Sequence, residues 1–167
     1  MWLVIKSVIS LIVSALLTIA PGNAFLESFE IFELAEKNDI LTIADEVQTG
    51  HGRTGKLYGF MNYSVTPDIF STAKGLGGGL PLGATVLGEK VENVLAAGDH
   101  GSTFGGNPVA SAGALSIINR IDDAFLDEVK AKSEYVFDAL NGAEGVESVS
   151  GMGLMIGIKP KADAKAV

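Results

Sequence analysis

The first feature of this sequence that could do chemistry is a lysine placed between an apolar run and a series of glycines. The sequence of residues 71–84 is STAKGLGGGLPLGA, with Lys74 directly before the glycines. We expect the amine of Lys74 to be partly desolvated there, which makes its neutral form accessible. A neutral amine among small residues can attack an aldehyde and form an imine. On spacing alone, the alternative is a surface lysine at a strand end, which is the commoner arrangement.

The glycines themselves could bind a ligand. The chain has 21 of them, crowded between Gly50 and Gly113 and interrupted by apolar segments, which indicates backbone held close to a ligand. The sequence contains no Gly-x-x-x-x-Gly-Lys-Ser/Thr pattern, so a P-loop is excluded. The dinucleotide-binding fingerprint fits the spacing poorly.

A carboxylate and an amide follow a second apolar run. The sequence of residues 44–55 is ADEVQTGHGRTG. At the carboxyl end of a parallel strand, Asp45 would face the crevice where such folds bind ligands. It could pair with a protonated ring nitrogen and keep a pyridine cationic, while Gln48 could donate to a phenolate oxygen. Taken alone, Asp45 and Glu46 are more typical of a capping or solvated acidic pair. We expect Arg53 to brace the loop, with an ion pair to Glu46 as the alternative.

Hydroxyl groups gather in a third stretch. Residues 100–108 have the sequence HGSTFGGNP, directly before a predicted helix. The hydroxyls of Ser102 and Thr103 and the neighbouring glycine amides suit an anion such as phosphate. Ordinary loop and cap residues are the alternative, and the stretch alone favours them.

The elements that must position these residues alternate between helix and strand in the middle of the chain. Residues 26–38 carry apolar side chains at helical spacing, and residues 40–44 form a short apolar run typical of a buried parallel strand. This alternation predicts an α/β fold with a mostly parallel sheet and helices on both faces. The other predicted helices are 89–96, 107–120 and 124–140, and the other predicted strands are 68–72, 83–87, 146–150 and 154–158.

Composition excludes several classes of function. The formal net charge of −8 argues against nucleic-acid binding, which needs clustered Lys and Arg. Cysteine is absent from the chain, so disulfide scaffolds, thiolate zinc sites and cysteine nucleophiles are excluded. With only two histidines, we expect no His-rich metal site.

Taken together, the three stretches resemble the class III, or ornithine-type, aminotransferases, which are fold type I pyridoxal-phosphate enzymes. The similarity runs from about residue 26 to about residue 160, with Asp45, Gln48, Lys74 and Thr103 in the family's order. Asp45 precedes Lys74 by 29 positions and Thr103 follows it by 29. The segments most similar to the acetylornithine branch of the family are TPD at 66–68, AKGLGGG at 73–79 and GGNP at 105–108.

This resemblance implies a role for each residue. Lys74 would hold pyridoxal 5′-phosphate (PLP) as a Schiff base and would carry the proton during transamination. Asp45 would keep the pyridine nitrogen protonated, and Gln48 would contact the ring hydroxyl oxygen. Thr103, with Ser102 beside it, would bind the phosphate, in the family from the other subunit of a homodimer.

The resemblance also implies the reaction and its place. We expect transfer of an amino group from N-acetylornithine to 2-oxoglutarate in arginine biosynthesis, in the cytoplasm and without membrane or nucleic-acid partners. Another ω-amino donor, namely ornithine, succinylornithine or 4-aminobutyrate, is the alternative. A degenerate chain without catalysis is a further alternative.

The ends of the chain differ from its middle. Residues 1–24 form an apolar leader similar to a signal peptide, and we expect joined or mis-started sequence there rather than an export signal. We assign residues 25–140 to part of a PLP-binding large domain and residues 141–167 to the start of a small C-terminal domain. Chains of the family are roughly twice this length or more. We therefore expect a truncated chain with little or no activity alone.

Overall fold

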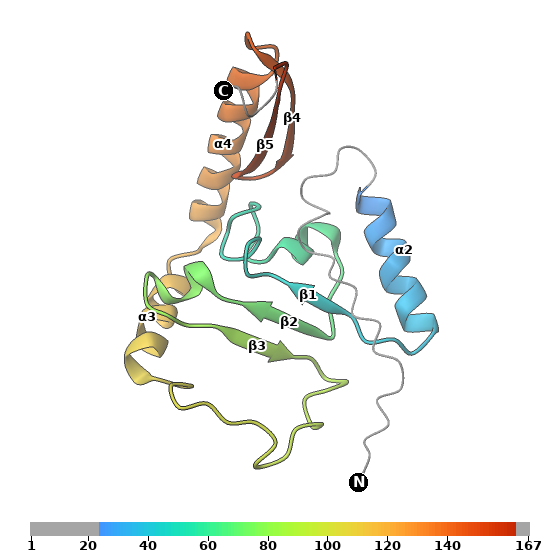
Figure 1. Ribbon diagram of the computed structural model, residues 1–167, viewed down its shortest axis with the longest axis vertical. Coiled ribbons are helices and arrows are strands. Elements are labelled where there is room, and N and C mark those ends of the chain that lie inside the picture. The colour runs from blue at the N-terminus through green and yellow to red at the C-terminus, as the bar shows by residue number, and fades with distance from the viewer. Residues whose placement is uncertain (1–23, 163–167) are drawn as a thin grey trace.

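The computed structural model describes residues 24–162 of the chain (Figure 1). Apart from Ala24, the predicted apolar leader lies outside the described residues. None of the helices in the described part is long and apolar enough to span a membrane. The helices are α2 (Ala24–Lys37), α3 (Pro108–Ile118) and α4 (Asp123–Leu140), with 3-10 turns η1 (Gly59–Tyr63) and η2 (Lys74–Gly77). The strands are β1 (Ile43–Asp45), β2 (Ile69–Thr72), β3 (Ala84–Leu87), β4 (Val146–Met152) and β5 (Met155–Pro160).

The strands form two separate sheets. The first has the order β1-β2-β3, in which β1 and β2 are parallel and β2 and β3 are antiparallel. The second is the antiparallel hairpin β4-β5. The parallel pair places the carboxyl ends of β1 and β2 at one edge of the sheet, where folds of this kind bind ligands.

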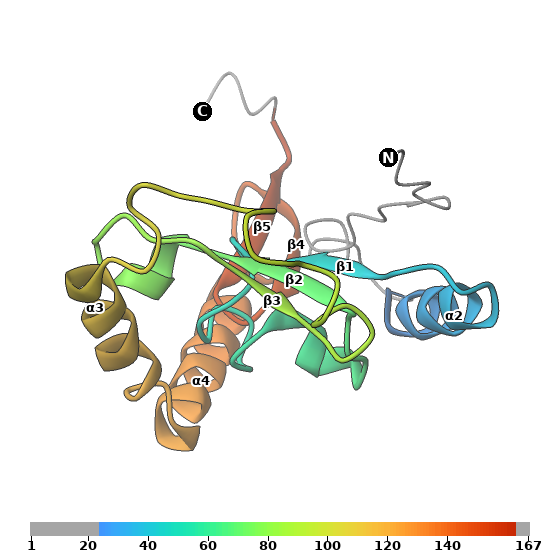
Figure 2. The same ribbon diagram turned by 90° about the horizontal axis from the view of Figure 1, so that it is seen from below.

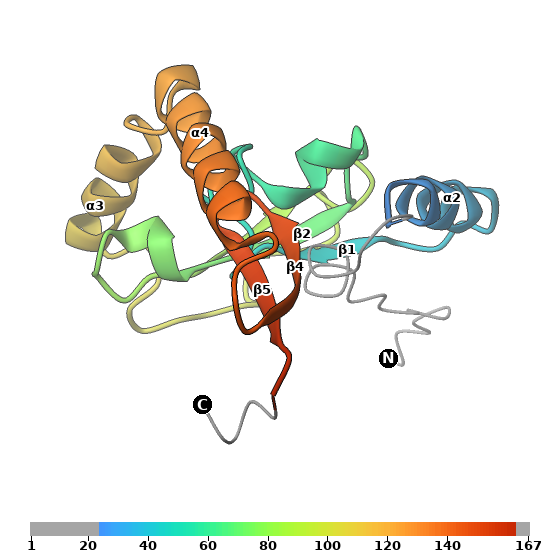
Figure 3. The same ribbon diagram turned by 90° about the horizontal axis from the view of Figure 1, so that it is seen from above.

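The helices surround the sheets unevenly. Helix α2 lies at one end of the three-stranded sheet, and α3 lies at the other (Figures 1 and 2). Helix α4 lies alongside the β4-β5 hairpin and contacts β4 (Figures 1 and 3). The buried apolar side chains are mostly small, and they are Ala35, Ala44, Tyr63, Leu76, Val91, Ala110, Ala114 and Val129.

The starts of α3 and α4 follow from their capping residues. The side chain of Asn107 accepts hydrogen bonds from the backbone N–H groups of Val109 and Ala110, and Pro108 occupies the first turn of α3. The side chain of Asp122 accepts from Phe125 N at the start of α4. Both predicted helices are confirmed, with ends that differ by one or two residues.

One predicted helix is wrong. Residues 89–96 form a series of turns, in which Val91 N donates to Gly88 O and Val94 N donates to Val91 O. Val94 and Leu95 are exposed, and Val91 alone in this range is buried. A helix of this length needs an apolar face packed against the protein to be stable. Without such packing, the helical spacing of residues 89–96 is not enough to form a helix.

One glycine at the end of η2 and one within α3 let the turn and the helix approach closely. A Cβ atom added to Gly78, whose φ is +61°, would lie 2.9 Å from the side chain of Ile117. A Cβ atom added to Gly113 would lie 3.1 Å from the carbonyl oxygen of Gly77. These glycines therefore serve the packing of a helix against the turn, a role the sequence interpretation did not give them.

Candidate functional site

The parallel pairing of β1 and β2 brings Asp45 to the edge of the sheet near the turn that carries Lys74. Asp45 is the last residue of β1 and lies opposite Ser71 in β2. Oδ1 of Asp45 accepts hydrogen bonds from Val47 N at 3.1 Å and from the hydroxyl of Ser71 at 3.3 Å. Among the described residues, no hydrogen bond reaches the other carboxylate oxygen of Asp45. That oxygen is therefore available to a donor outside the described chain.

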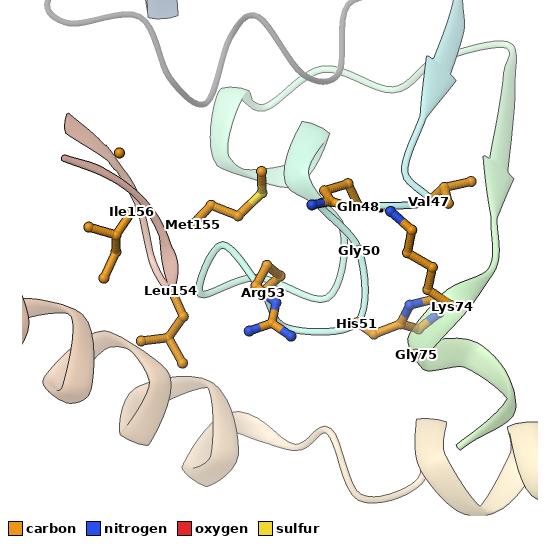
Figure 4. Close-up of a pocket in the computed structure, with 11 residues that line it drawn as sticks. Val47, Gln48, Gly50, His51, Arg53, Lys74, Gly75, Leu154, Met155 and Ile156 are labelled. Atoms are coloured by element: carbon orange, nitrogen blue, oxygen red, sulfur yellow. Dashed lines mark hydrogen bonds between the residues drawn. The ribbon is translucent and has the colours of Figure 1, made fainter. Parts of the chain in front are cut away.

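Lys74 begins the turn η2 directly after β2, and its amine donates a hydrogen bond to Oε1 of Gln48. The structure thus brings together two of the predicted site residues. Both side chains are exposed, so the expected partial desolvation of the Lys74 amine is wrong for this structure. The backbone before Lys74 belongs to strand β2, whereas the side chain of Lys74 extends into an open pocket (Figure 4).

The connection from β1 to η1, residues 46–58, is here called the strand-end loop. Its centre is the carboxylate of Glu46, which is only 2% exposed. This carboxylate accepts hydrogen bonds from the hydroxyl of Thr49 (2.6 Å), Gly59 N (2.7 Å) and Phe60 N (2.9 Å). Neither the solvated acidic pair nor the alternative ion pair with Arg53 is found in the described structure. Glu46 is instead the internal anchor of the loop that presents Gln48.

A pocket of about 490 Å³ opens beside Lys74 (Figure 4). The strand-end loop and η2 form one side of it, and the β4-β5 hairpin forms the other. The two sides are connected by a hydrogen bond from Leu154 N to the carbonyl oxygen of Arg53 at 2.9 Å. The lining residues are Val47, Gln48, Gly50, His51, Arg53, Lys74, Gly75, Leu154, Met155, Ile156 and Gly157. Since this lining includes two cationic side chains and no carboxylate, it favours an anionic ligand.

Ser102 and Thr103 do not join this pocket. They lie in the connection from β3 to α3, residues 88–107, which is here called the distal loop. From residue 92 onward every residue of the distal loop is exposed, Ser102 and Thr103 included. The structure therefore brings Gln48 and Lys74 together, places Asp45 on the adjacent strand end, and leaves the two hydroxyl residues on the surface.

His51 and Arg53 line the pocket, although the sequence analysis gave neither a role in binding. The ring of His51 forms a hydrogen bond with the hydroxyl of Thr72 at 3.1 Å and lies against the ring of Tyr58. Burial lowers the pKa of His51 below its ordinary value, and this effect outweighs the opposing charge of Glu46. The only signal in the sequence was their position in the glycine-rich segment that carries Gln48.

Comparison with known proteins shows which family the chain resembles. Residues 16–167 match the family described as Aminotransferase class-III. The acetylornithine aminotransferase of Haemophilus ducreyi is 49% identical over 137 residues, which cover 82% of this chain and 34% of the relative. That of Corynebacterium efficiens is 46% identical over 126 residues, covering 75% of this chain and 31% of the relative. The chain thus spans about a third of the length of the curated relatives it matches.

Solved structures share the arrangement of the described elements. The ornithine aminotransferase of Toxoplasma gondii superposes with a TM-score of 0.75 at 31% identity, covering 89% of this chain and 35% of that one. The N-acetylornithine aminotransferase of Stenotrophomonas maltophilia gives 0.71 at 33% identity, covering 81% and 36%. These likenesses confirm the predicted α/β fold of a partial fold type I aminotransferase domain. In the described residues only the β1-β2 pairing is parallel, so the expected mostly parallel sheet is not seen there. The chain belongs to the class III aminotransferase family.

Proposed function

We propose that this chain provides the lysine and part of the ring-binding site of a PLP-dependent transaminase. One observation carries the proposal: the amine of Lys74 meets the side chain of Gln48 where β1 and β2 end side by side. In this proposal Lys74 holds PLP covalently, Asp45 pairs with the pyridine nitrogen and Gln48 contacts the ring oxygen. Ser102 and Thr103 bind the phosphate.

The residues present fit this cofactor. The pocket is large enough for a substituted ring, and its lining of Lys74 and Arg53 without a carboxylate suits a phosphorylated aldehyde. Asp45 has one carboxylate oxygen available to accept from a ring N–H, while Ser71 and the backbone hold the other. When bound, PLP withdraws electrons from the substrate carbon that loses its proton.

The chain's own groups would handle the substrate and the proton. The Lys74 amine can accept a proton and return it at a neighbouring atom, because the flexible side chain moves about a fixed backbone. Gln48 orients that amine through its carbonyl oxygen and retains its amide N–H groups for a ring oxygen. Arg53 and Lys74 favour substrates that carry a carboxylate.

The proposed donor is N-acetylornithine and the proposed acceptor is 2-oxoglutarate, in the cytoplasm. The names of the curated relatives from Haemophilus ducreyi and Corynebacterium efficiens support this donor. Ornithine is the second candidate, because ornithine aminotransferases are among the solved structures with the same arrangement. A homodimer is also proposed, since the exposed position of Thr103 suits contact with a ligand held by a second subunit.

Covalent trapping tests the proposal. The chain is incubated with PLP, reduced with borohydride, digested and mapped by mass spectrometry. The expected result is a yellow absorption band before reduction and, after reduction, a label on the peptide that contains Lys74. Lys74→Arg should abolish both, whereas Lys56→Arg, in the strand-end loop but outside the pocket, should change neither. A label spread equally over the lysines would contradict the proposal.

The donor is tested on the same preparation. N-acetylornithine, ornithine and 4-aminobutyrate are added separately to the PLP-loaded chain, and the fading of the yellow band is followed. The fastest change is expected with N-acetylornithine. A faster change with ornithine would transfer the assignment to the second candidate without affecting the role of Lys74.

A further inference from the structure

The side chain of His51 lies beside the chain on both sides of Lys74. Before the lysine, the ring nitrogen Nε2 of His51 and the hydroxyl of Thr72 form a hydrogen bond at 3.1 Å, and the side chain of Thr72 is buried. After the lysine, a Cβ atom built on Gly75 would lie 3.5 Å from Cβ and Nδ1 of His51. The imidazole therefore forms a hydrogen bond to Thr72 of β2 before Lys74 and lies next to Gly75 of η2 after it, and Figure 4 shows His51 beside Lys74 and Gly75.

The backbone at both residues has an uncommon conformation. Lys74 has a φ of 48° and His51 a φ of 57°, which place both in the left-handed region. Side chains with a Cβ atom are disfavoured there, and such a residue persists only where the surrounding structure fixes it. For Lys74 the surrounding structure includes the imidazole of His51.

The imidazole is itself held in place. Its ring packs edge-on against Tyr58, with the ring centroids 5.9 Å apart. Tyr58 in turn stacks on Phe60 and packs against Phe70 of β2. His51 therefore connects the aromatic cluster of Tyr58, Phe60 and Phe70 to the turn that begins with Lys74.

We propose that His51 is a positioning residue for Lys74: through Thr72 and Gly75 it fixes the backbone of the lysine so that the amine meets Gln48 and enters the pocket. The consequence for PLP capture rests on the proposed function. The backbone effect does not, and it can be measured without cofactor.

The first experiment measures the rate at which Lys74 captures PLP, by stopping the reaction with borohydride at increasing times. His51→Leu and Thr72→Val should each slow capture by about fivefold to tenfold, because each removes the same hydrogen bond. The double variant should be no slower than the single ones, as expected for two halves of one interaction. His51→Gln, whose amide can reach the position of Nε2, should restore most of the rate.

Thr54→Val is the matched control. Thr54 is as deeply buried as Thr72, and its hydroxyl accepts a hydrogen bond from the Asn62 side chain at 3.0 Å, but Thr54 does not line the pocket that Lys74 lines. This variant should lower stability in the same way and leave the capture rate unchanged. An equal loss of rate in Thr54→Val and His51→Leu would overturn the proposal.

The second experiment measures amide hydrogen exchange without cofactor. Leu76 N donates to Ala73 O and Gly78 N donates to Gly75 O, so their exchange reports on η2. His51→Leu and Thr72→Val should accelerate exchange at both amides by about fivefold or more, and Thr54→Val should not. If the wild-type chain captures no PLP, the proposed function fails and this measurement alone decides the role of His51. Unchanged exchange in His51→Leu would overturn that role.

Discussion

The strand-end loop and the distal loop are both long connections that carry predicted site residues, yet they are built in opposite ways. The strand-end loop folds around the buried Glu46, and most of its residues are buried or half-buried. The distal loop is exposed from residue 92 to residue 107, and its Phe104 is 82% exposed. The contrast shows that the strand-end loop is organised within the chain, and the exposure of the distal loop is consistent with our proposal that its hydroxyl residues bind phosphate across a homodimer.

Removal of the Glu46 carboxylate should have the largest effect, because it removes the group that organises the strand-end loop. Glu46→Ala leaves the hydroxyl of Thr49 and the N–H groups of Gly59 and Phe60 without their acceptor in a buried place. The free energy of unfolding, measured by urea denaturation, should fall by about 3 kcal/mol. Glu92→Ala in the distal loop should change it by less than about 0.5 kcal/mol. Equal effects would show that the strand-end loop is not organised by its carboxylate.

A hairpin glycine packed against the strand-end loop and a glycine of the distal loop test whether close packing or backbone conformation matters. A Cβ atom at Gly153 would lie 2.5 Å from Arg53 O, and φ there is +58°. Gly98 in the distal loop has a φ of +96°, with no atom within 4 Å of an added Cβ. Gly153→Ala should cost about 2 kcal/mol or more and Gly98→Ala about 1 kcal/mol, by thermal or urea unfolding. A smaller loss at Gly153 would mean that the hairpin does not rest on the strand-end loop.

A substitution at Thr103 tests the role of the distal loop. Thr103→Val removes an exposed hydroxyl, so the free energy of unfolding should stay within about 0.5 kcal/mol of the wild type. The dissociation constant for PLP, from absorbance titration, should rise about tenfold if the hydroxyl binds phosphate. Thr85→Val, at an exposed position of β3, serves as the control. Unchanged affinity would remove Thr103 from the proposed site.

The smallest effect is expected at Asp68, which joins the start of β2 to the distal loop. Its carboxylate accepts hydrogen bonds from Thr42 N and Oγ1, both at 2.8 Å, and pairs with Lys90 at 3.3 Å. Burial by itself raises the pKa of Asp68, but the Thr42 hydrogen bonds and Lys90 together hold this pKa below its ordinary value.

Because that pKa is lower in the folded state, the stabilisation is present above about pH 4 and is lost as the pH falls through the folded value. Asp68→Asn should therefore lower the free energy of unfolding by about 1 kcal/mol at neutral pH and by much less near pH 3. Urea denaturation at the two pH values measures the difference. An equal loss at both would exclude ionisation as the cause.

The sequence predicted the elements well where apolar spacing and caps coincide. Asn107 with Pro108 and the apolar run before Lys74 gave helix α3 and strand β2 because local preferences and tertiary packing agree there. Residues 89–96 had helical spacing but no surface to pack against, so the predicted helix does not form.

Only part of the site could be predicted from the sequence. Lys74 and Gln48 were found because their motifs carry the resemblance to the family. The burial of Glu46 and the placement of His51 depend on contacts with Gly59, Tyr58 and Thr72. No local pattern encodes such contacts, so a carboxylate expected in solvent became the anchor of a loop. The proposed domain boundary after residue 140 stays a prediction.

The contact between Lys74 and Gln48 joins residues 26 positions apart, and it forms only when β1 and β2 pair in register. During refolding, therefore, each chain must close this loop before the amine gains its partner. The rate at which the yellow band of captured PLP appears would then report the rate at which β1 and β2 pair. A stopped-flow trace of its appearance would report when the sheet edge forms, with no label other than the cofactor.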